Sequence, residues 1–187
     1  MRDFSKIKCT IWQSRKFTML NDAHKMFYLY LHTNGRVNSC GCYNNPLGYI
    51  MVDLTWAAEK ISVAYRACIE AGLIQYDAET ETVYIENFFS VSAPQNPKHA
   101  IKILSDIDKI PSKKLKSLCA LELRNFVANT GWKIEADFIY RIDRLASTGI
   151  MPPSAKKESK HGSRPKPPTS KGNANQELEA FLDGRRS

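Results

Sequence analysis

Long apolar runs are absent from this sequence of 187 residues. No segment approaches the roughly eighteen apolar residues that cross a bilayer, and the first residues, MRDFSKIKCTIWQ, lack the apolar core of a signal peptide. The sequence therefore predicts a cytoplasmic protein with no membrane partner. Hydrophobic residues make up 43% and charged residues 25%, which is ordinary for one globular domain with a tail.

Motifs for catalysis are also missing. The sequence has no glycine-rich phosphate loop, no Walker lysine and no Gly-x-Ser-x-Gly turn. Asp106 and Asp108 are two positions apart, so on a helix they do not share a face. We therefore expect a protein that is not an enzyme and needs no cofactor.

Cysteine is scarce and irregularly spaced. The five cysteines form no repeating framework, which argues against a disulfide-linked fold. Cys40 and Cys42 are close together, but the histidines have no spacing that would complete a zinc site of four ligands. We expect no metal site and interpret these two cysteines as small apolar side chains near a turn.

Positive charge is concentrated in the second half of the chain. The net charge is +8, yet residues 1–90 hold nine Lys/Arg and nine Asp/Glu. Residues 91–150 hold ten against six, and residues 151–187 hold eight against four. Non-specific attraction to a polyanion should therefore come mostly from the second half.

The tail, residues 151–187, begins with a stretch rich in Pro, Ser, Lys and Gly and poor in large apolar residues. Such a stretch cannot offset its ordering entropy by burial, so we predict disorder. Near its end, Leu178, Phe181 and Leu182 have the spacing of one helix face. That segment is either a peptide that folds onto a partner or a frayed end.

The first ninety residues predict three helices and a hairpin. After a mixed extended segment, KIKCTIWQSRKFTML, a helix should begin at Asn21 or Asp22 and end at Asn34-Gly35. A second should begin near Pro46, and Thr55 should cap a third that ends at Gly72 in the left-handed conformation. The expected inward side chains are Met26, Phe27, Tyr30 and Leu31, then Leu47, Ile50, Met51 and Leu54, then Ile61, Ala64, Tyr65, Cys68 and Ile69.

A hairpin should follow the third helix directly. LIQYD and TVYIENF alternate as strands do, around the turn AETE, and SCGCY is a short strand-like stretch before the second helix. Helix, short strand, helix, helix and hairpin is the order of a winged helix-turn-helix. Alternatively, the hairpin is a ribbon that closes the core.

Three more helices should follow as a small helical extension, which packs on the winged helix or mediates self-association. The first carries Pro97 in its first turn, the second ends before Gly131, and the third places Phe138, Ile142 and Leu145 on one side. The predicted fold is therefore mainly α with a small β-hairpin wing. It comprises a winged helix-turn-helix at residues 1–92, an extension at 93–150 and the tail at 151–187.

The run from about residue 8 to residue 100 resembles the N-terminal winged-helix region of phage and prophage replication proteins, the replisome organisers or DnaD-type initiators. The motifs are W-x-S-x-K-F at 12–17, LYL-x-TN at 29–34, PLGYI at 46–50, EAGLI-x-YD at 70–77 and PQNP at 94–97. The resemblance implies binding to origin DNA, remodelling of DNA, or recruitment of a host helicase or its loader. Ala57 and Ala58 stand where many relatives carry charged or polar residues.

The third helix should enter the major groove of double-stranded DNA. Its expected contacts are Thr55, Lys60, Ser62, Val63 and Arg66, with further phosphate contacts from Lys6, Lys8, Arg15 and Lys16. Glu59 and Glu70 on this helix oppose such binding, and Glu79 and Glu81 in the wing turn should repel phosphate.

Two functions remain open from the residues. The first is a DNA-binding replication initiator or organiser. The second is an interaction module that pairs with itself or with a helicase-loading protein. A transcriptional regulator of a mobile element is a further alternative. The basic second half favours the first function, whereas the neutral first ninety residues and the acidic wing favour the second.

Overall fold

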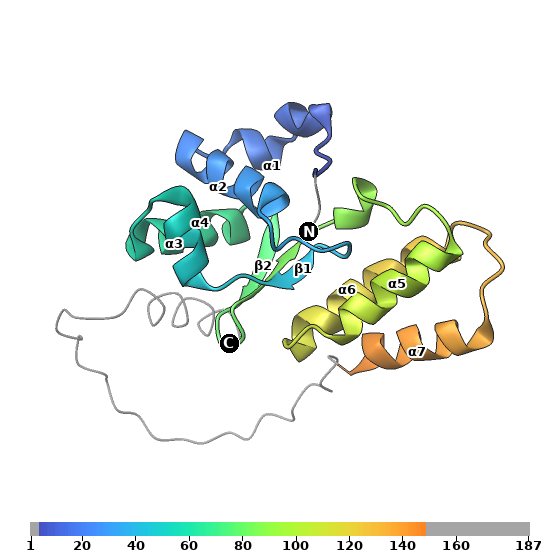
Figure 1. Ribbon diagram of the computed structural model, residues 1–187. Helices are drawn as coiled ribbons and strands as arrows, with labels where there is room; N and C mark the ends of the chain where they lie inside the picture. Colours follow the sequence, from blue (N-terminus) through green and yellow to red (C-terminus); the bar gives the residue numbers. More distant parts are fainter. Residues whose placement is uncertain (1–3, 149–187) are drawn as a thin grey trace, which may run out of the picture.

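The computed structural model describes residues 4–148, so the predicted tail lies outside the described residues (Figure 1). In chain order, the elements are a 3₁₀ turn at Cys9–Gln13, α1 (Arg15–Thr18), α2 (Asp22–Thr33), β1 (Cys42–Asn44), α3 (Leu47–Leu54), α4 (Ala58–Glu70), β2 (Ile74–Asp77), β3 (Thr82–Ile85), a 3₁₀ turn at Phe88–Ser90, α5 (Pro97–Asp108), α6 (Lys113–Ala128) and α7 (Ala136–Ser147). No helix among these is long and apolar enough to cross a membrane.

The three strands form one antiparallel sheet in the order β1-β3-β2. Cys42 of β1 lies opposite Tyr84, and Ile74 of β2 lies opposite Ile85. Together with α2, α3 and α4, this sheet completes the winged helix-turn-helix order that the sequence predicts. The short strand before the second helix and the hairpin after the third are both confirmed.

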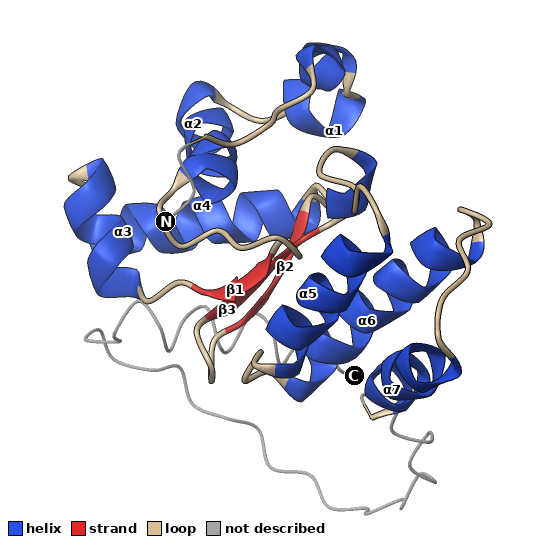
Figure 2. Cartoon of the chain, turned by 45° about the vertical axis from the view of Figure 1, so that its right-hand side comes forward, coloured by secondary structure: helices blue, strands red, loops and turns tan. Residues whose placement is uncertain are grey.

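The sheet lies between two groups of helices (Figure 2). Helices α2, α3 and α4 lie on one side, while α5 and α6 lie on the other, with α7 packed against α6. All four residues of β3 are buried, because α6 covers the face that α4 leaves open. The predicted helical extension therefore packs on the winged helix and shares its hydrophobic core. The boundary between residues 92 and 93 stays a prediction.

A carboxylate on α6 fixes the extension to the sheet. Glu122 accepts a hydrogen bond from the Tyr84 hydroxyl at 2.8 Å and another from the Phe89 backbone N–H at 3.2 Å. Partial burial raises the pKa of Glu122, because the charged form loses contact with water. The two donors offset part of that cost, so this residue joins α6 to both β3 and the turn after it.

The Cys40-Gly41-Cys42 stretch contacts α6 on the same side. Both thiols are fully buried, as expected of small apolar side chains, and the Cys119 thiol donates to the Cys40 carbonyl at 3.5 Å. Gly41 has φ +69, and a Cβ there would lie 2.3 Å from a ring carbon of Phe88. Only glycine lets the backbone approach that ring closely enough.

Helix α4 ends as predicted, in a left-handed glycine. Gly72 has φ +64; its N–H donates to the Ile69 carbonyl at 2.9 Å, and the Leu73 N–H donates to the Cys68 carbonyl at 3.0 Å. These two bonds form a Schellman motif, which satisfies carbonyls at the end of the helix. The chain then turns directly into β2.

Three local expectations were wrong. The segment before Asn21, which was expected to be extended, contains the 3₁₀ turn at Cys9–Gln13 and helix α1. Phe17 of α1 is fully buried in the core, and this packing stabilises the short helix. Met26 and Met51 point outward, with 49% and 38% exposure. Each lies at the edge of its helix's apolar stripe, where neighbouring helices leave it uncovered.

Two alanine substitutions should shift stability in opposite directions. Gly72→Ala should destabilise the protein by about 1 kcal/mol, since an alanine is strained at positive φ. Gly48→Ala should stabilise it by up to about 1 kcal/mol, because Gly48 is exposed in α3 and a Cβ there would have no neighbour within 4 Å. Urea unfolding of both variants tests this, and equal effects would contradict the left-handed cap.

The folded state should be less stable in mild acid because of His32. This residue is 5% exposed, and its ring lies 4.7 Å from that of Tyr28 and 6.1 Å from that of Phe88. Burial lowers the pKa of His32 from 6.5 to about 4. Between these two values, His32 is protonated in the unfolded chain but neutral in the folded protein. The free energy of unfolding should therefore fall as the pH drops from 6.5 towards 4.

Between pH 7 and pH 5, we expect the parent to lose about 2 kcal/mol more than a His32→Phe variant. The comparison removes the contribution of other titrating groups such as Glu122. Urea unfolding at both pH values measures the difference, and identical pH dependence in the two proteins would show that His32 is not held neutral.

Candidate nucleic-acid interface

The outward face of α4 begins with Lys60 and Val63. Lys60 is exposed and Val63 is 50% exposed, as the sequence predicts. Glu59 and Glu70 are exposed on the same helix, one near each end. A cation and an apolar side chain are therefore available to a ligand in the first half of the helix, with a carboxylate beside them.

Two other predicted contacts on α4 lie differently. Ser62 was expected outward but is 4% exposed, on a helix that packs against α2, α3 and β2. It cannot reach a ligand at the helix surface. Arg66 is half-buried, and its Nε is shielded from solvent. The face available to a ligand is therefore narrower than predicted.

Thr55 does not cap α4. It ends α3 instead, in the left-handed conformation with φ 54, and Ala57 precedes α4 without a side-chain hydrogen bond. A β-branched residue at positive φ is strained, and such strain is often found at functional turns. Thr55 is exposed in the turn between the two helices, so its hydroxyl is accessible to a ligand of the helix-turn-helix.

Lys60 is held in place by an aromatic platform. Its ammonium lies 3.9 Å from the ring centroid of Trp56, and Trp56 stacks on the buried Phe27 at 6.4 Å. A cation over an indole face is attracted by the ring and loses some freedom. The charge is therefore positioned at the start of α4 before any ligand arrives.

The turn of the wing is tied to α3. Glu81 accepts a hydrogen bond from the Leu47 N–H at 3.0 Å, which caps the first turn of α3. Asn44 donates to the Thr80 carbonyl at 2.8 Å. The structural role of Glu81 could not be expected from local sequence patterns, since its partner is 34 positions away. Of the two acidic side chains in this turn, Glu79 is the exposed one.

Of the four predicted basic contacts near the N-terminus, Lys16 does not join the start of α4. Lys16 donates to the Gly72 carbonyl at 3.0 Å, which places it at the far end of α4. Gly72 follows Lys60 by twelve positions and lies just beyond the end of α4, so the two are about 18 Å apart along the helix axis. Lys6, Lys8 and Arg15 are exposed in the segment before α2. Of these four residues, Lys16 is therefore the one that the contacts place away from Lys60.

Helix α3 carries exposed apolar side chains that were not predicted. Val52 is 78% exposed and Tyr49 is 53% exposed, and the Arg36 guanidinium lies 3.3 Å from the centroid of the Tyr49 ring. Helical spacing alone does not reveal them, because α3 is apolar on most of its circumference. They lie on the helix that precedes α4 in the helix-turn-helix.

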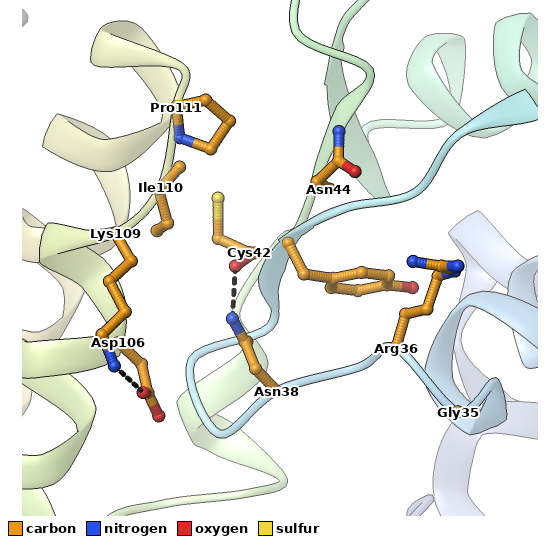
Figure 3. Close-up of a pocket in the computed structure, with 10 residues that line it drawn as sticks. Gly35, Arg36, Asn38, Cys42, Asn44, Asp106, Lys109, Ile110 and Pro111 are labelled. Atoms are coloured by element: carbon orange, nitrogen blue, oxygen red, sulfur yellow. Dashed lines mark hydrogen bonds and ion pairs between the residues drawn. The ribbon is translucent and has the colours of Figure 1, made fainter. Parts of the chain in front are cut away.

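A groove of about 490 Å³ with a mixed polar and apolar lining lies between the winged helix and the extension (Figure 3). Arg36, Asn38 and Asn44 line it from the winged helix, and Asp106, Lys109 and Pro111 from the end of α5. Its cations already have partners: Lys109 pairs with Asp106 at 3.7 Å, and Arg36 lies over Tyr49. We therefore do not assign the binding site to this groove.

The net charge of the winged helix is positive before α2 and negative from α2 onward. Residues 22–90 hold four Lys/Arg and eight Asp/Glu, whereas residues 4–21 hold four Lys/Arg and no acidic residue. A polyanion near α4 would therefore be repelled by carboxylates and attracted mainly by the ammonium group of Lys60. Stronger attraction lies before α2 and on the extension.

No family model, curated protein or solved structure matches this chain. Within residues 4–148, no group of three or more His, Cys, Asp or Glu side chains is arranged to hold a metal ion. The arrangement of α3, α4, Lys60 and Val63 is therefore the basis for assigning a function.

Loss of the Glu81 side chain should lower the free energy of unfolding. Glu81→Ala should cost about 1 kcal/mol, the usual effect of removing a helix cap. Glu81→Gln keeps an acceptor oxygen and should cost less, while Glu79→Ala, at an exposed position in the same turn, should change stability by about half a kcal/mol or less. Thermal or urea unfolding measures all three. Equal costs for Glu81→Ala and Glu79→Ala would contradict the cap.

Proposed function

We propose that this protein is a cytoplasmic DNA-binding protein of the phage or prophage replication type. In this role it binds double-stranded origin DNA and recruits a host helicase or helicase loader, as an initiator or replisome organiser does. The observation that carries the DNA-binding part is the exposed first half of α4, which presents Lys60 and Val63 beside the turn at Thr55.

These side chains suit the major groove. A lysine can donate to the acceptors of a guanine edge or to a phosphate, and an apolar side chain can contact the thymine methyl group. The Thr55 hydroxyl can bond a phosphate and so fix the position of the helix on the duplex. With two base-reading side chains, sequence discrimination should be modest.

Much of the affinity should come from outside α4. Exposed lysines on the extension supply positive charge that reads no sequence: Lys98, Lys102, Lys113 and Lys114. This division agrees with the acidic balance of residues 22–90. The part of the proposal that concerns origins and helicase recruitment rests on the resemblance of the motifs at 12–17, 46–50 and 70–77 to replication proteins.

A protein-interaction module is the second candidate, since Val52 and Tyr49 are exposed on α3. In that case α3 and α4 would contact a second copy or a helicase-loading protein. The two candidates share one surface, so one set of variants separates them.

Lys60→Gln should weaken binding to a specific duplex by roughly 5- to 150-fold. The duplex is selected by the full-length protein from a random-sequence library, and fluorescence anisotropy compares it with a scrambled duplex. Binding to the scrambled duplex should change little, because only one of many cations is removed. Lys133→Gln, an equal change of charge on the loop before α7, is the matched control.

Melting curves should show Lys60→Gln to be folded, since removing an exposed cation–π interaction costs about 1 kcal/mol or less. Unchanged duplex binding by Lys60→Gln, together with weaker self-association in sedimentation, would contradict the DNA proposal and support the interaction module.

A further inference from the structure

In addition to the face of α4, the protein has a second segment whose side chains suit a nucleic acid. It consists of residues 4–20, called the N-terminal arm below. Two of its aromatic side chains are exposed, Phe4 by 72% and Trp12 by 61%. Lys6, Lys8 and Arg15 are exposed between and after them. Exposed aromatic rings can stack on bases and the neighbouring cations can contact phosphates, which together is the chemistry of a single-strand binding surface.

The arm has a charge unlike that of the domain to which it belongs. It contains four Lys/Arg and no Asp/Glu, whereas residues 22–90 carry an excess of acidic residues. In sequence, the nearest acidic residues are Asp3 before the arm and Asp22 after it, and Asp22 pairs with Lys25 at 3.7 Å. By its charge, this segment should attract a polyanion more strongly than residues 22–90 do.

The ring of Trp12 packs against a buried aromatic side chain. Its ring meets the buried Phe17 ring edge to face, with centroids 5.2 Å apart and planes at 79°. Phe17 is fully buried at the base of α1, so the indole is held against the domain while much of its surface stays exposed. A ring fixed in this way loses little freedom when a flat ligand stacks on it.

We propose that the N-terminal arm binds single-stranded DNA, with bases stacked on Trp12 and Phe4 and phosphates bound by Lys6, Lys8 and Arg15. Every base offers a π-face, so a positively charged surface with aromatic platforms binds single strands without strong sequence preference. Duplex DNA hides its base faces in the stack and would use the cations alone. The surface is therefore distinct from the face of α4, and the inference does not depend on duplex recognition there.

Anisotropy of a labelled oligothymidylate of twenty nucleotides tests the proposal with the full-length protein. Trp12→Ala should weaken binding by roughly 5- to 150-fold, and Phe4→Ala should act in the same direction. Trp12→Phe should restore most of the affinity, because it keeps an aromatic face. Binding to a duplex of twenty base pairs should be unchanged in all three variants.

Salt titration separates the cations from the rings. Lys6→Gln with Lys8→Gln should reduce the slope of log affinity against log salt by about 1.4, because each phosphate of a single strand that is no longer neutralised lowers it by about 0.7. Trp12→Ala should lower affinity and leave the slope in place. Melting curves show whether Trp12→Ala is folded, and Phe4→Ala, at a more exposed site, gives the same test independently.

Met19→Ala is the matched control, since Met19 is 75% exposed in the same arm but has no aromatic face. It should bind the oligothymidylate as the parent does. Equal decreases in affinity for Met19→Ala and Trp12→Ala, with reduced self-association in sedimentation, would overturn the proposal and make the arm an interface between protein chains. Failure of the parent to bind the oligothymidylate, or full binding by Trp12→Ala, would also overturn it, whatever the result with duplex DNA.

Discussion

Burial of β3 on both faces is the constraint on which the rest of the structure depends. A hairpin exposed on one side cannot bury all four residues from Thr82 to Ile85, so α6 must cover the face that α4 does not. Glu122 on α6 completes this contact by accepting hydrogen bonds from Tyr84 and from the Phe89 backbone. The helical extension is therefore part of the structural support of the winged helix, and the hairpin is also a ribbon that closes the core.

This support determines which surfaces are left for a ligand. The wing turn is fixed to α3 by Glu81, the side of α4 towards the sheet is buried, and the groove beside α5 has its charges paired. Among the surfaces that stay exposed within residues 4–148 are the first half of α4 with Lys60 and the N-terminal arm with Trp12. One suits the edges of paired bases and the other the faces of unpaired bases. A protein that must hold duplex DNA while a strand is separated would need both.

The sequence predicts the order of the elements well, because each long helix has a clear apolar stripe and a recognisable end. Gly72 and Pro97 are examples, and the structure confirms both. The site is predicted less well, since it depends on contacts between distant residues. Periodicity cannot show that Ser62 is buried, that Thr55 ends one helix instead of beginning the next, or that Lys16 reaches Gly72. Each of these follows from tertiary packing.

Backbone hydrogen exchange of the full-length protein, with and without a bound duplex, tests the central claim most directly. The account predicts slower exchange in the turn from Thr55 to Ala57 and in the first half of α4, together with the start of α5 or α6, where the exposed lysines lie. Protection confined to α5 and α6, with α4 unchanged, would contradict the assignment of the duplex to the helix-turn-helix.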